Sequence, residues 1–312
     1  MKRIKPTIFQ MMRAPFLSSI LSPLIGGTLL AVAVSGSFNL PGFIFVLIMG
    51  IGLHVATNVY NDIYDTIQGT DKVNVHRNEF SGGSGILLNF PELMPQMYRL
   101  ARTGLVVAFF ATVILTFVID RSLWLHLWSL YILSAFFSKF YTAAPIKLAY
   151  RGWGEISVWF AFGPMAILVA AVSQNVGFHP HIIAVMPATG ISTLSILLIG
   201  QLIDFDADKQ AGKWGVAVRF GTKFTALLYI AVQSILVIDI MVLAMMMMPR
   251  GWFLLLVLIP YVFLFPKAAR IVLNHHDQPD ELKKAAGINV QIHLLFALFF
   301  SLGIAGGLLL ST

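Results

Sequence analysis

Apolar residues do not alternate with polar ones along most of this chain. They form runs of about 20 residues, the length of helix that crosses a bilayer core of about 30 Å. The pattern predicts nine transmembrane helices, at residues 15–35, 42–61, 101–119, 123–141, 155–174, 181–203, 225–248, 252–269 and 288–310. We therefore expect an all-α integral membrane protein, with the helices packed in one bundle as a single domain over residues 1–312.

The composition agrees with this class. Of the 312 residues, 58% are apolar and only 11% are charged, whereas a soluble domain carries about 25% charged residues. Disordered and nucleic-acid-binding proteins are excluded on the same grounds. The chain has no cysteine, which excludes disulfides, thiolate metal sites and cysteine nucleophiles. Within the eighth segment, Pro260 and Pro266 predict a kink or an early end.

The basic residues predict the orientation in the membrane. Nineteen of the 21 Lys and Arg residues lie in the N-terminus or in the loops after the second, fourth, sixth and eighth segments. Only Arg121 and Arg250 lie on the opposite side. The positive-inside rule then places the N-terminus and these loops in the cytoplasm, and the protein in the inner (plasma) membrane. The first apolar run lacks a small-residue cleavage site after it, so we interpret it as a retained helix.

Six of the 14 acidic residues fall in two short stretches, each at the expected cytoplasmic end of a helix. The first stretch follows the second segment and the other follows the sixth. On a helix, Asn58, Asp62 and Asp65 share one face, and Asp204 and Asp208 share another. Like charges one turn apart repel each other and need compensation at a membrane edge. Hard oxygen ligands of this kind suit Mg²⁺, which binds through carboxylates together with substrate phosphates.

The alternative interpretation is that these acids are ordinary charges at helix ends. That interpretation accounts for one cluster, but poorly for two at matched positions when acids are so scarce elsewhere. The clusters also indicate an internal repeat, because Asp62 precedes Asp204 by 142 positions and Asp65 precedes Asp208 by 143. We expect two parallel four-helix repeats, at about residues 1–150 and 151–285, plus a ninth helix. Parallel repeats would bring both clusters to the same membrane face.

These motifs resemble the UbiA superfamily of intramembrane prenyltransferases, most of all its 1,4-dihydroxy-2-naphthoate polyprenyltransferase branch. The resemblance covers nearly the whole chain. The family's first motif reads N-D-x-x-D-x-x-x-G-x-D, and all five fixed positions match, at Asn61, Asp62, Asp65, Gly69 and Asp71. The second motif, D-x-x-x-D followed by a G-K step and an A-V-R-x-G run, matches at Asp204, Asp208, Gly212, Lys213, Ala217, Val218, Arg219 and Gly221. A third stretch, from Tyr141 through Lys147 to Glu155, is also similar.

The resemblance implies a Mg²⁺-dependent transfer of a polyprenyl group from its diphosphate to an aromatic acceptor, through an allylic carbocation. The implied metal ligands are Asp62, Asp65, Asp204 and Asp208. The implied catalytic residues are Asp71, as the base for the acceptor hydroxyl, with Lys147 and Tyr141 as donors. The implied diphosphate-binding residues are Asn58, Asn61, Arg13, Arg77, Arg151, Lys209, Lys213 and Gln201.

One departure from the family pattern concerns the residues before the second motif, where Asn and Arg are common. Here Gln201 retains an amide, but Ile203 provides no cation. We expect Lys209 or Lys213 to replace that cation. The glycine-rich run Ser81–Gly85 is a candidate loop to fold over the site, although no strand precedes it and it is a weak phosphate-binding signal.

The acceptor stays open at this point. The G-x-D ending of the first motif favours 1,4-dihydroxy-2-naphthoate, and hence menaquinone biosynthesis. Alternatives are 4-hydroxybenzoate, homogentisate and geranylgeranylglyceryl phosphate. A membrane transporter is the alternative from another class, since it also uses parallel repeats and intramembrane acids. Transporters place their charges near the midplane, whereas these acids gather at one face, which favours an enzyme.

Overall fold

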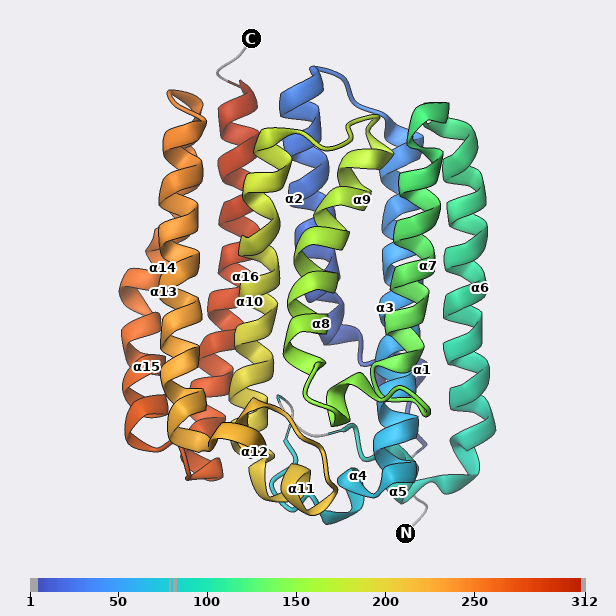
Figure 1. Ribbon diagram of the computed structural model, residues 1–312, viewed down its shortest axis with the longest axis vertical. Coiled ribbons are helices and arrows are strands. Elements are labelled where there is room, and N and C mark those ends of the chain that lie inside the picture. Colours follow the sequence, from blue (N-terminus) through green and yellow to red (C-terminus); the bar gives the residue numbers. More distant parts are fainter. Residues whose placement is uncertain (1–4, 79, 81–82, 310–312) are drawn as a thin grey trace.

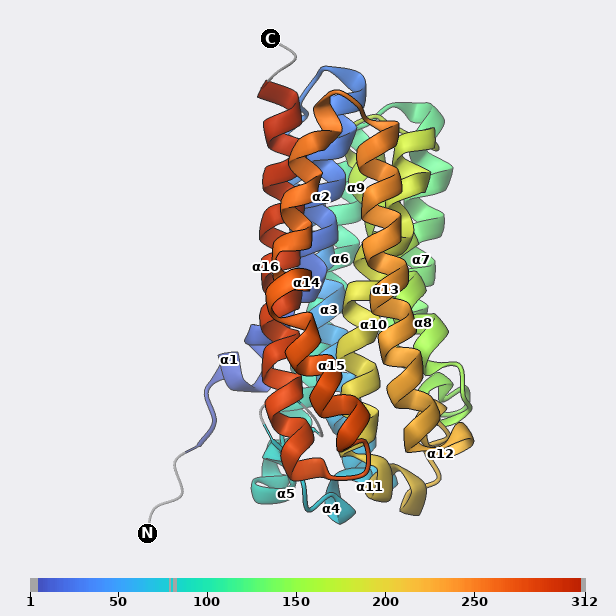
Figure 2. The same ribbon diagram turned by 90° about the vertical axis from the view of Figure 1, so that its left-hand side faces the viewer.

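The computed structural model describes residues 5–78, 80 and 83–309, and within these residues it contains helices and no strand. The helices that make up the bundle run along one axis (Figures 1 and 2). They are α2 (Ser18–Ser35), α3 (Leu40–Gln68), α6 (Met94–Val118), α7 (Trp124–Phe140), α8 (Gly154–Phe160), α9 (Ala166–Ser173), α10 (Pro180–Ile203), α13 (Thr222–Met246), α14 (Leu258–Phe263), α15 (Phe265–Asn274) and α16 (Pro279–Leu309). The all-α expectation is confirmed.

Eight helical segments of the described chain are long and apolar enough to cross a membrane. They are Ala14–Ser35, Leu40–Gln68, Pro91–Val118, Gly154–Ser173, Pro180–Ile203, Thr222–Met246, Gly251–Asn274 and Pro279–Gly307. These correspond to eight of the nine segments expected from the sequence. The expected segment 123–141 is α7, which has 17 helical residues and falls outside this set. The chain is an integral membrane protein.

Short helices gather at one end of the bundle, the lower end in Figure 1. They are α1 (Ile8–Met11), α4 (Thr70–Val73), α5 (Ile86–Asn89), α11 (Phe205–Gln210) and α12 (Val216–Phe220). The two acidic stretches, one at the end of α3 and one following α10, both lie at this end, because α3 and α10 end on the same side. The antiparallel course of the connected helices therefore brings two distant parts of the sequence together.

Helix α3 carries the first acidic stretch on its last turns, and its ends follow from local sequence. The Asn39 side chain accepts a hydrogen bond from the Gly42 N–H at 3.0 Å, which caps the start. At the other end Gly69 adopts φ 87°, the left-handed conformation that glycine tolerates and that ends helices. The 29 residues between extend for about 44 Å, longer than the bilayer core. The last turns can therefore carry carboxylates at the membrane edge.

Two helical segments are interrupted by proline-containing turns. The segment of α8 and α9 passes through a π-helical stretch, η5 (Ala161–Met165), which contains Pro164. The eighth expected segment breaks at Leu264, between α14 and α15, and Pro266 lies in the first turn of α15. The predicted interruption of that segment is confirmed, because proline lacks the N–H that would continue the helix.

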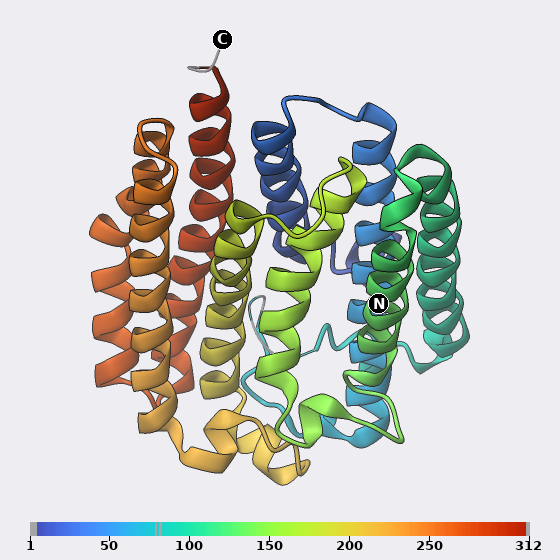
Figure 3. The same cartoon turned by 45° about the horizontal axis from the view of Figure 1, so that its top comes forward.

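Figures 1 and 3 show the α8–α9 segment between α10 and α7.

In the first half of the chain, α3 and α6 make a close contact at Gly52 and Gly104. A Cβ atom added to Gly52 would lie 2.6 Å from the carbonyl oxygen of Gly104. Small residues at such a crossing let two membrane helices approach through their backbones. The position of α3, and of the carboxylates at its end, depends on this contact.

We expect Gly52→Ala to lower the free energy of unfolding by about 1–3 kcal/mol, because the added methyl group forces α3 away from the α6 backbone. Thermal unfolding of the purified protein in detergent would measure the change. Gly177→Ala is the matched control, since a Cβ there meets Leu123 only at 3.4 Å. Equal stability of the two variants would contradict the close α3–α6 contact.

Candidate active site

The two acidic stretches face one cavity of about 210 Å³ at the end of the bundle where the short helices lie. We call it the inner cavity. Its lining includes the acidic residues Asp65 and Asp71 from the first stretch and Asp204 and Asp208 from the second. Asp65, Asp71 and Asp208 are each at most 3% exposed. The fold therefore brings together four of the five acids to which the sequence assigned a role.

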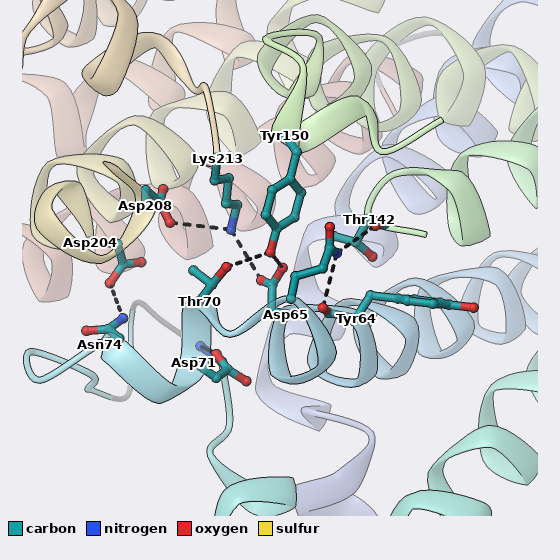
Figure 4. A network of polar contacts seen from close by, with 12 residues as sticks. Tyr64, Asp65, Thr70, Asp71, Asn74, Thr142, Tyr150, Asp204, Asp208 and Lys213 are labelled. Atoms are coloured by element: carbon teal, nitrogen blue, oxygen red, sulfur yellow. Dashed lines mark hydrogen bonds and ion pairs between the residues drawn. The ribbon is translucent and has the colours of Figure 1, made fainter. Parts of the chain in front are cut away.

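Lys213 joins the two acidic stretches. Its Nζ atom lies 3.2 Å from Oδ2 of Asp65 and 3.7 Å from Oδ1 of Asp208, and Figure 4 shows the ammonium group between them. Although burial lowers it, the pKa of Lys213 is raised well above its usual value by the carboxylates of Asp208 and Asp65. The lysine is therefore charged, and it provides the cation that two facing carboxylates require.

Tyr150 makes a second link to Asp65. Its hydroxyl donates to Oδ1 of Asp65 at 2.6 Å and lies 2.6 Å from Oγ1 of Thr70. Because the phenol has one proton, Thr70 donates to Tyr150 in this arrangement. Burial, followed by the Asp65 charge, raises the pKa of Tyr150, so the phenol keeps its proton. Both oxygens of Asp65 are thus occupied, one by a lysine and one by a tyrosine (Figure 4).

Asn74 makes a third link between the stretches. It follows α4, and its Nδ2 donates to Oδ1 of Asp204 at 2.8 Å. Asp204 is partly exposed, whereas Asp206 of the same turn is exposed and points away from the lining. This agrees with the expected opposite directions of Asp204 and Asp206 on a helix.

Asp62 is buried beside the cavity rather than in its lining. Its Oδ1 accepts a hydrogen bond from the Ser84 N–H at 3.0 Å and lies 3.6 Å from Nη1 of Arg13. Its Oδ2 has no hydrogen-bond partner among the described residues. The predicted covering loop does reach the acids at Gly83 and Ser84, while Ser81 and Gly82 lie outside the described residues.

Asp71 lines the inner cavity at the start of α4. The Thr66 hydroxyl donates to its Oδ2 at 3.1 Å, and the Gly83 N–H donates to its Oδ1 at 3.2 Å. Burial, with the charges of Asp65 and Asp62, raises the pKa of Asp71 to about 6. A carboxyl group with a raised pKa accepts a proton more readily than an ordinary one, as a general base must.

The donor set fits a divalent cation, although no three or more His, Asp or Glu residues of the described chain lie close enough together to hold one. Among the described residues, buried Oδ2 of Asp62 and Oδ1 of Asp208 accept no hydrogen bond, and Nζ of Lys213 lies 3.7 Å from the latter. Burial raises the pKa of Asp208 to about 7 despite the opposing charge of Lys213. Buried carboxylate oxygens with free lone pairs are the ligands that Mg²⁺ prefers.

Other predicted residues also line the inner cavity: Arg13, Asn58, Asn61, Tyr141, Lys213 and Gln201. The Asn58 side chain donates to the Met12 carbonyl at 3.3 Å, which ties α3 to the N-terminal segment. Gln201 donates to Oε1 of Glu155 at 2.5 Å and accepts from the Ala217 N–H at 3.3 Å. Gln201 therefore connects α10 with α8 and α12 as well as facing the cavity.

Four predicted cations do not line the inner cavity. Lys147 and Arg151 line a separate cavity together with Tyr150. Lys209 is exposed, with Nζ 5.7 Å from the centre of the Phe205 ring. Arg77 donates to the backbone carbonyl of Asp71 instead of facing the cavity. The positions of Arg77, Lys147 and Arg151 do not follow from the sequence, because spacing along the chain gives no direction to side chains outside long helices.

The inner cavity continues into the bundle as an apolar cavity of about 90 Å³. Five residues belong to both linings: His54, Thr57, Tyr141, Val158 and Phe162. The rings of His54 and Phe162 meet edge to face, with their centres 5.2 Å apart. The site therefore combines a charged compartment at the membrane edge with an apolar one inside the membrane, joined at these residues.

The sequence did not identify Thr70, Asn74 and Tyr150 as site residues. Thr70 and Asn74 lie close to Asp71, which was the only signal available for them. Tyr150 lies within the third motif stretch, between Lys147 and Glu155, but nothing in the spacing connects it to Asp65, 85 positions away. Only the packing of the loop after α7 against α3 reveals this contact.

We expect Lys213→Met to destabilise the metal-free protein by an amount on the order of 3 kcal/mol, because removing one partner leaves buried carboxylates uncompensated. Thermal unfolding in detergent with EDTA would show this loss. Added Mg²⁺ should restore more stability to this variant than to the wild type. Lys209→Met, at an exposed lysine near the same turn, is the control, and equal stability of the two variants in EDTA would contradict the bridging role of Lys213.

Comparison with known proteins shows the family of the chain. The sequence profile of the UbiA prenyltransferase family matches residues 20–303. The chain is 25% identical to the 2-carboxy-1,4-naphthoquinone phytyltransferase of Synechocystis sp. over 93% of its length and 90% of the relative's. It is 23% identical to the 1,4-dihydroxy-2-naphthoate octaprenyltransferase of Bacillus subtilis, over 95% and 91% of the two chains.

Solved structures share the fold. The structure of a UbiA homolog from Archaeoglobus fulgidus bound to GPP and Mg²⁺ matches with a TM-score of 0.61 and 16% identity, over 96% of this chain and 97% of that one. The profile match covers most of the chain, including both acidic stretches. The chain therefore belongs to the UbiA prenyltransferase family and is a membrane-embedded prenyltransferase.

Proposed function

We propose that this enzyme transfers a polyprenyl group from a polyprenyl diphosphate to 1,4-dihydroxy-2-naphthoate. The observation that carries this proposal is the pair of joined cavities, one lined by carboxylates and one apolar. A polyprenyl diphosphate has the same division, with a charged head and a long apolar tail. The charged head suits the inner cavity and the first part of the tail suits the apolar one, so the reacting carbon would lie where the two cavities meet.

In the proposed reaction, the bond between C1 of the prenyl group and the diphosphate oxygen breaks, and its electron pair leaves with the diphosphate. A ring carbon of the acceptor then attacks the allylic cation and forms the new C–C bond. The ring regains its aromaticity by losing a proton or carbon dioxide from that carbon. When bound, Mg²⁺ neutralises the diphosphate oxygens and makes the diphosphate a better leaving group.

The proposed metal ligands are Asp62, Asp65, Asp204 and Asp208. Lys213 and Arg13 would bind diphosphate oxygens as cations, and Asn58, Asn61 and Gln201 would add hydrogen bonds. Asp71 would take the proton of the acceptor hydroxyl, and its raised pKa suits that role. Tyr141 belongs to both cavity linings, and it would donate near the breaking bond. The apolar walls would exclude the water that otherwise captures the cation.

The choice of acceptor rests on the relatives. Those from Synechocystis sp. and Bacillus subtilis are named for naphthoquinone or naphthoate substrates. We infer the same acceptor class here, and hence a role in menaquinone biosynthesis. The same chemistry on 4-hydroxybenzoate, homogentisate or geranylgeranylglyceryl phosphate is the alternative within this family. Family membership favours the enzyme over a transporter.

We also propose that α7 crosses the membrane, which makes nine spans in two parallel four-helix repeats plus α16. Helix α7 follows directly on the short 3₁₀ helix η3 (Arg121–Leu123), which lengthens its helical course. It runs beside α6 in Figures 1 and 3. In this topology the N-terminus and the inner cavity face the cytoplasm and the protein lies in the inner (plasma) membrane, in agreement with the distribution of Lys and Arg.

Asp65→Ala and Asp208→Ala should each lower the rate of transfer by at least about 10³-fold, since each removes a ligand for the ion that neutralises the leaving group. Product formation from a labelled prenyl diphosphate, with membrane insertion checked by fractionation, measures the effect. Asp206→Ala is the matched control, because Asp206 is exposed on the same turn of α11. An active Asp65→Ala variant would refute the proposed metal site.

Among the four acceptors named above, only 1,4-dihydroxy-2-naphthoate should yield a prenylated product at a high rate. Each acceptor would be incubated with the protein, Mg²⁺ and one labelled polyprenyl diphosphate, and the lipid products would be identified by mass spectrometry. Omitting Mg²⁺ should stop diphosphate release. Product from another acceptor would correct the substrate, and solute flux without any diphosphate release would overturn the proposed reaction.

A further inference from the structure

A second polar cavity lies next to the inner cavity, and we call it the outer cavity. It has a volume of about 520 Å³, and its lining includes Lys147, Tyr150 and Arg151. Gln68 and Gly212 add further polar and backbone surface from α3 and from the loop after α11. The charged side chains in this lining are both basic, so the outer cavity suits an anion.

The Tyr150 side chain lines the outer cavity and contacts residues that line the inner one. Its ring lies 5.8 Å from Nζ of Lys147, which lines the outer cavity, and 5.6 Å from Nζ of Lys213, which lines the inner one. Its hydroxyl donates to Asp65, a wall residue of the inner cavity. Tyr150 itself is only 6% exposed. One aromatic ring, held by the Asp65 carboxylate and Thr70, therefore lies within about 6 Å of two lysines that line different cavities.

The chemistry of the proposed function requires a polar exit. The prenylated product is apolar and can leave into the bilayer. Inorganic diphosphate carries several negative charges, which a bilayer core excludes. Asp65, Asp71 and Asp208 in the lining of the inner cavity are almost completely buried, so a diphosphate bound beside them needs a polar path outward at the cytoplasmic end of the inner cavity.

A competing exit lies near Asn74, which lines both the inner cavity and a third cavity. Lys72 and His76 line that third cavity, but so does the carboxylate of Asp206. An anion leaving there would pass a like charge, whereas an anion leaving past Tyr150 meets Lys147 and Arg151. The charge distribution therefore favours the route past Tyr150.

We propose that inorganic diphosphate leaves through the outer cavity, where Lys147 and Arg151 bind it after the Tyr150 side chain moves aside. This inference rests on the proposed function, because it takes diphosphate to be a product. Asp65 holds the tyrosine through the same carboxylate that is proposed to bind the metal with the diphosphate. Occupation of the inner cavity would therefore weaken the contact that keeps Tyr150 in place. Lys147 and Arg151, which line the outer cavity, then act in the release of diphosphate rather than in the transfer reaction itself.

Thiol accessibility tests the route without requiring activity. The chain has no cysteine, so Leu197→Cys, on the α10 wall of the inner cavity, introduces a single reporter thiol. The reporter thiol would be modified with a charged, water-soluble methanethiosulfonate. Tyr150→Ala should increase the rate of this modification at least about 10-fold. Tyr150→Phe keeps the ring but loses the hydrogen bond to Asp65, so it should increase the rate by a smaller factor. Asn74→Ala should leave the rate unchanged. Acceleration by Asn74→Ala but not by either Tyr150 variant would overturn the proposal.

Product inhibition tests the anion site. The double variant Lys147→Gln/Arg151→Gln should weaken inhibition by inorganic diphosphate about 10-fold while leaving the KM for the prenyl diphosphate within about 2-fold of the wild type. Lys209→Gln is the control with one exposed lysine removed. If inhibition and KM worsen together, both cations contact the reacting diphosphate and the exit site is wrong. If the wild type releases no diphosphate from any prenyl donor, the proposed function fails, and the accessibility result still decides whether Tyr150 closes the inner cavity.

Discussion

Asp65 and Asp208 come from different halves of the chain, and they would repel each other in the buried inner cavity if Lys213 did not lie 3.2 Å from one and 3.7 Å from the other. Charges of like sign repel strongly away from water, and each carboxylate also loses its hydration on burial. The α3 and α11 ends can therefore meet only around a cation. In the structure described here that cation is a lysine. In the proposed reaction the same electrostatic requirement is met by Mg²⁺.

The rest of the site depends on how the helix bundle positions these carboxylates. Helix α3 is long enough to pass beyond the bilayer core, and its close crossing with α6 at Gly52 and Gly104 holds it in place. Helix α10 ends on the same side, and the short α11 presents Asp208 toward Asp65. Cross-links that involve neutral groups, Tyr150 to Asp65 and Asn74 to Asp204, orient the carboxylates without adding charge. An apolar cavity continues from this charged end. The charged head and the apolar tail of an amphipathic substrate would therefore contact linings of different polarity.

Much of this could be predicted from the sequence because the signals are local. The apolar runs gave the helices, the prolines gave the interruption of the eighth segment, and helical spacing put Asp204 and Asp208 on one face and Asp206 on another. Positions set by tertiary contacts could not be predicted. Lys147 and Arg151 looked like ligands of the diphosphate, since they are basic and near a motif, yet the loop after α7 places them in the lining of the outer cavity. Asp62 has the motif spacing, but a loop backbone and Arg13 cover it.

An enzyme with a buried, charged site in a membrane must bind a lipid and release a charged product. These two tasks require cavity linings of different polarity. The apolar cavity among the helices is lined by no Asp, Glu, Lys or Arg that could hold a diphosphate, whereas the inner cavity is lined by four carboxylates and Lys213. In the proposed function the reacting carbon lies at the junction, where His54, Thr57, Tyr141, Val158 and Phe162 belong to both linings. Because a bilayer core excludes charge, the charged fragment would leave through the polar end. The proposed route at that end needs the Tyr150 side chain to move and no rearrangement of the bundle.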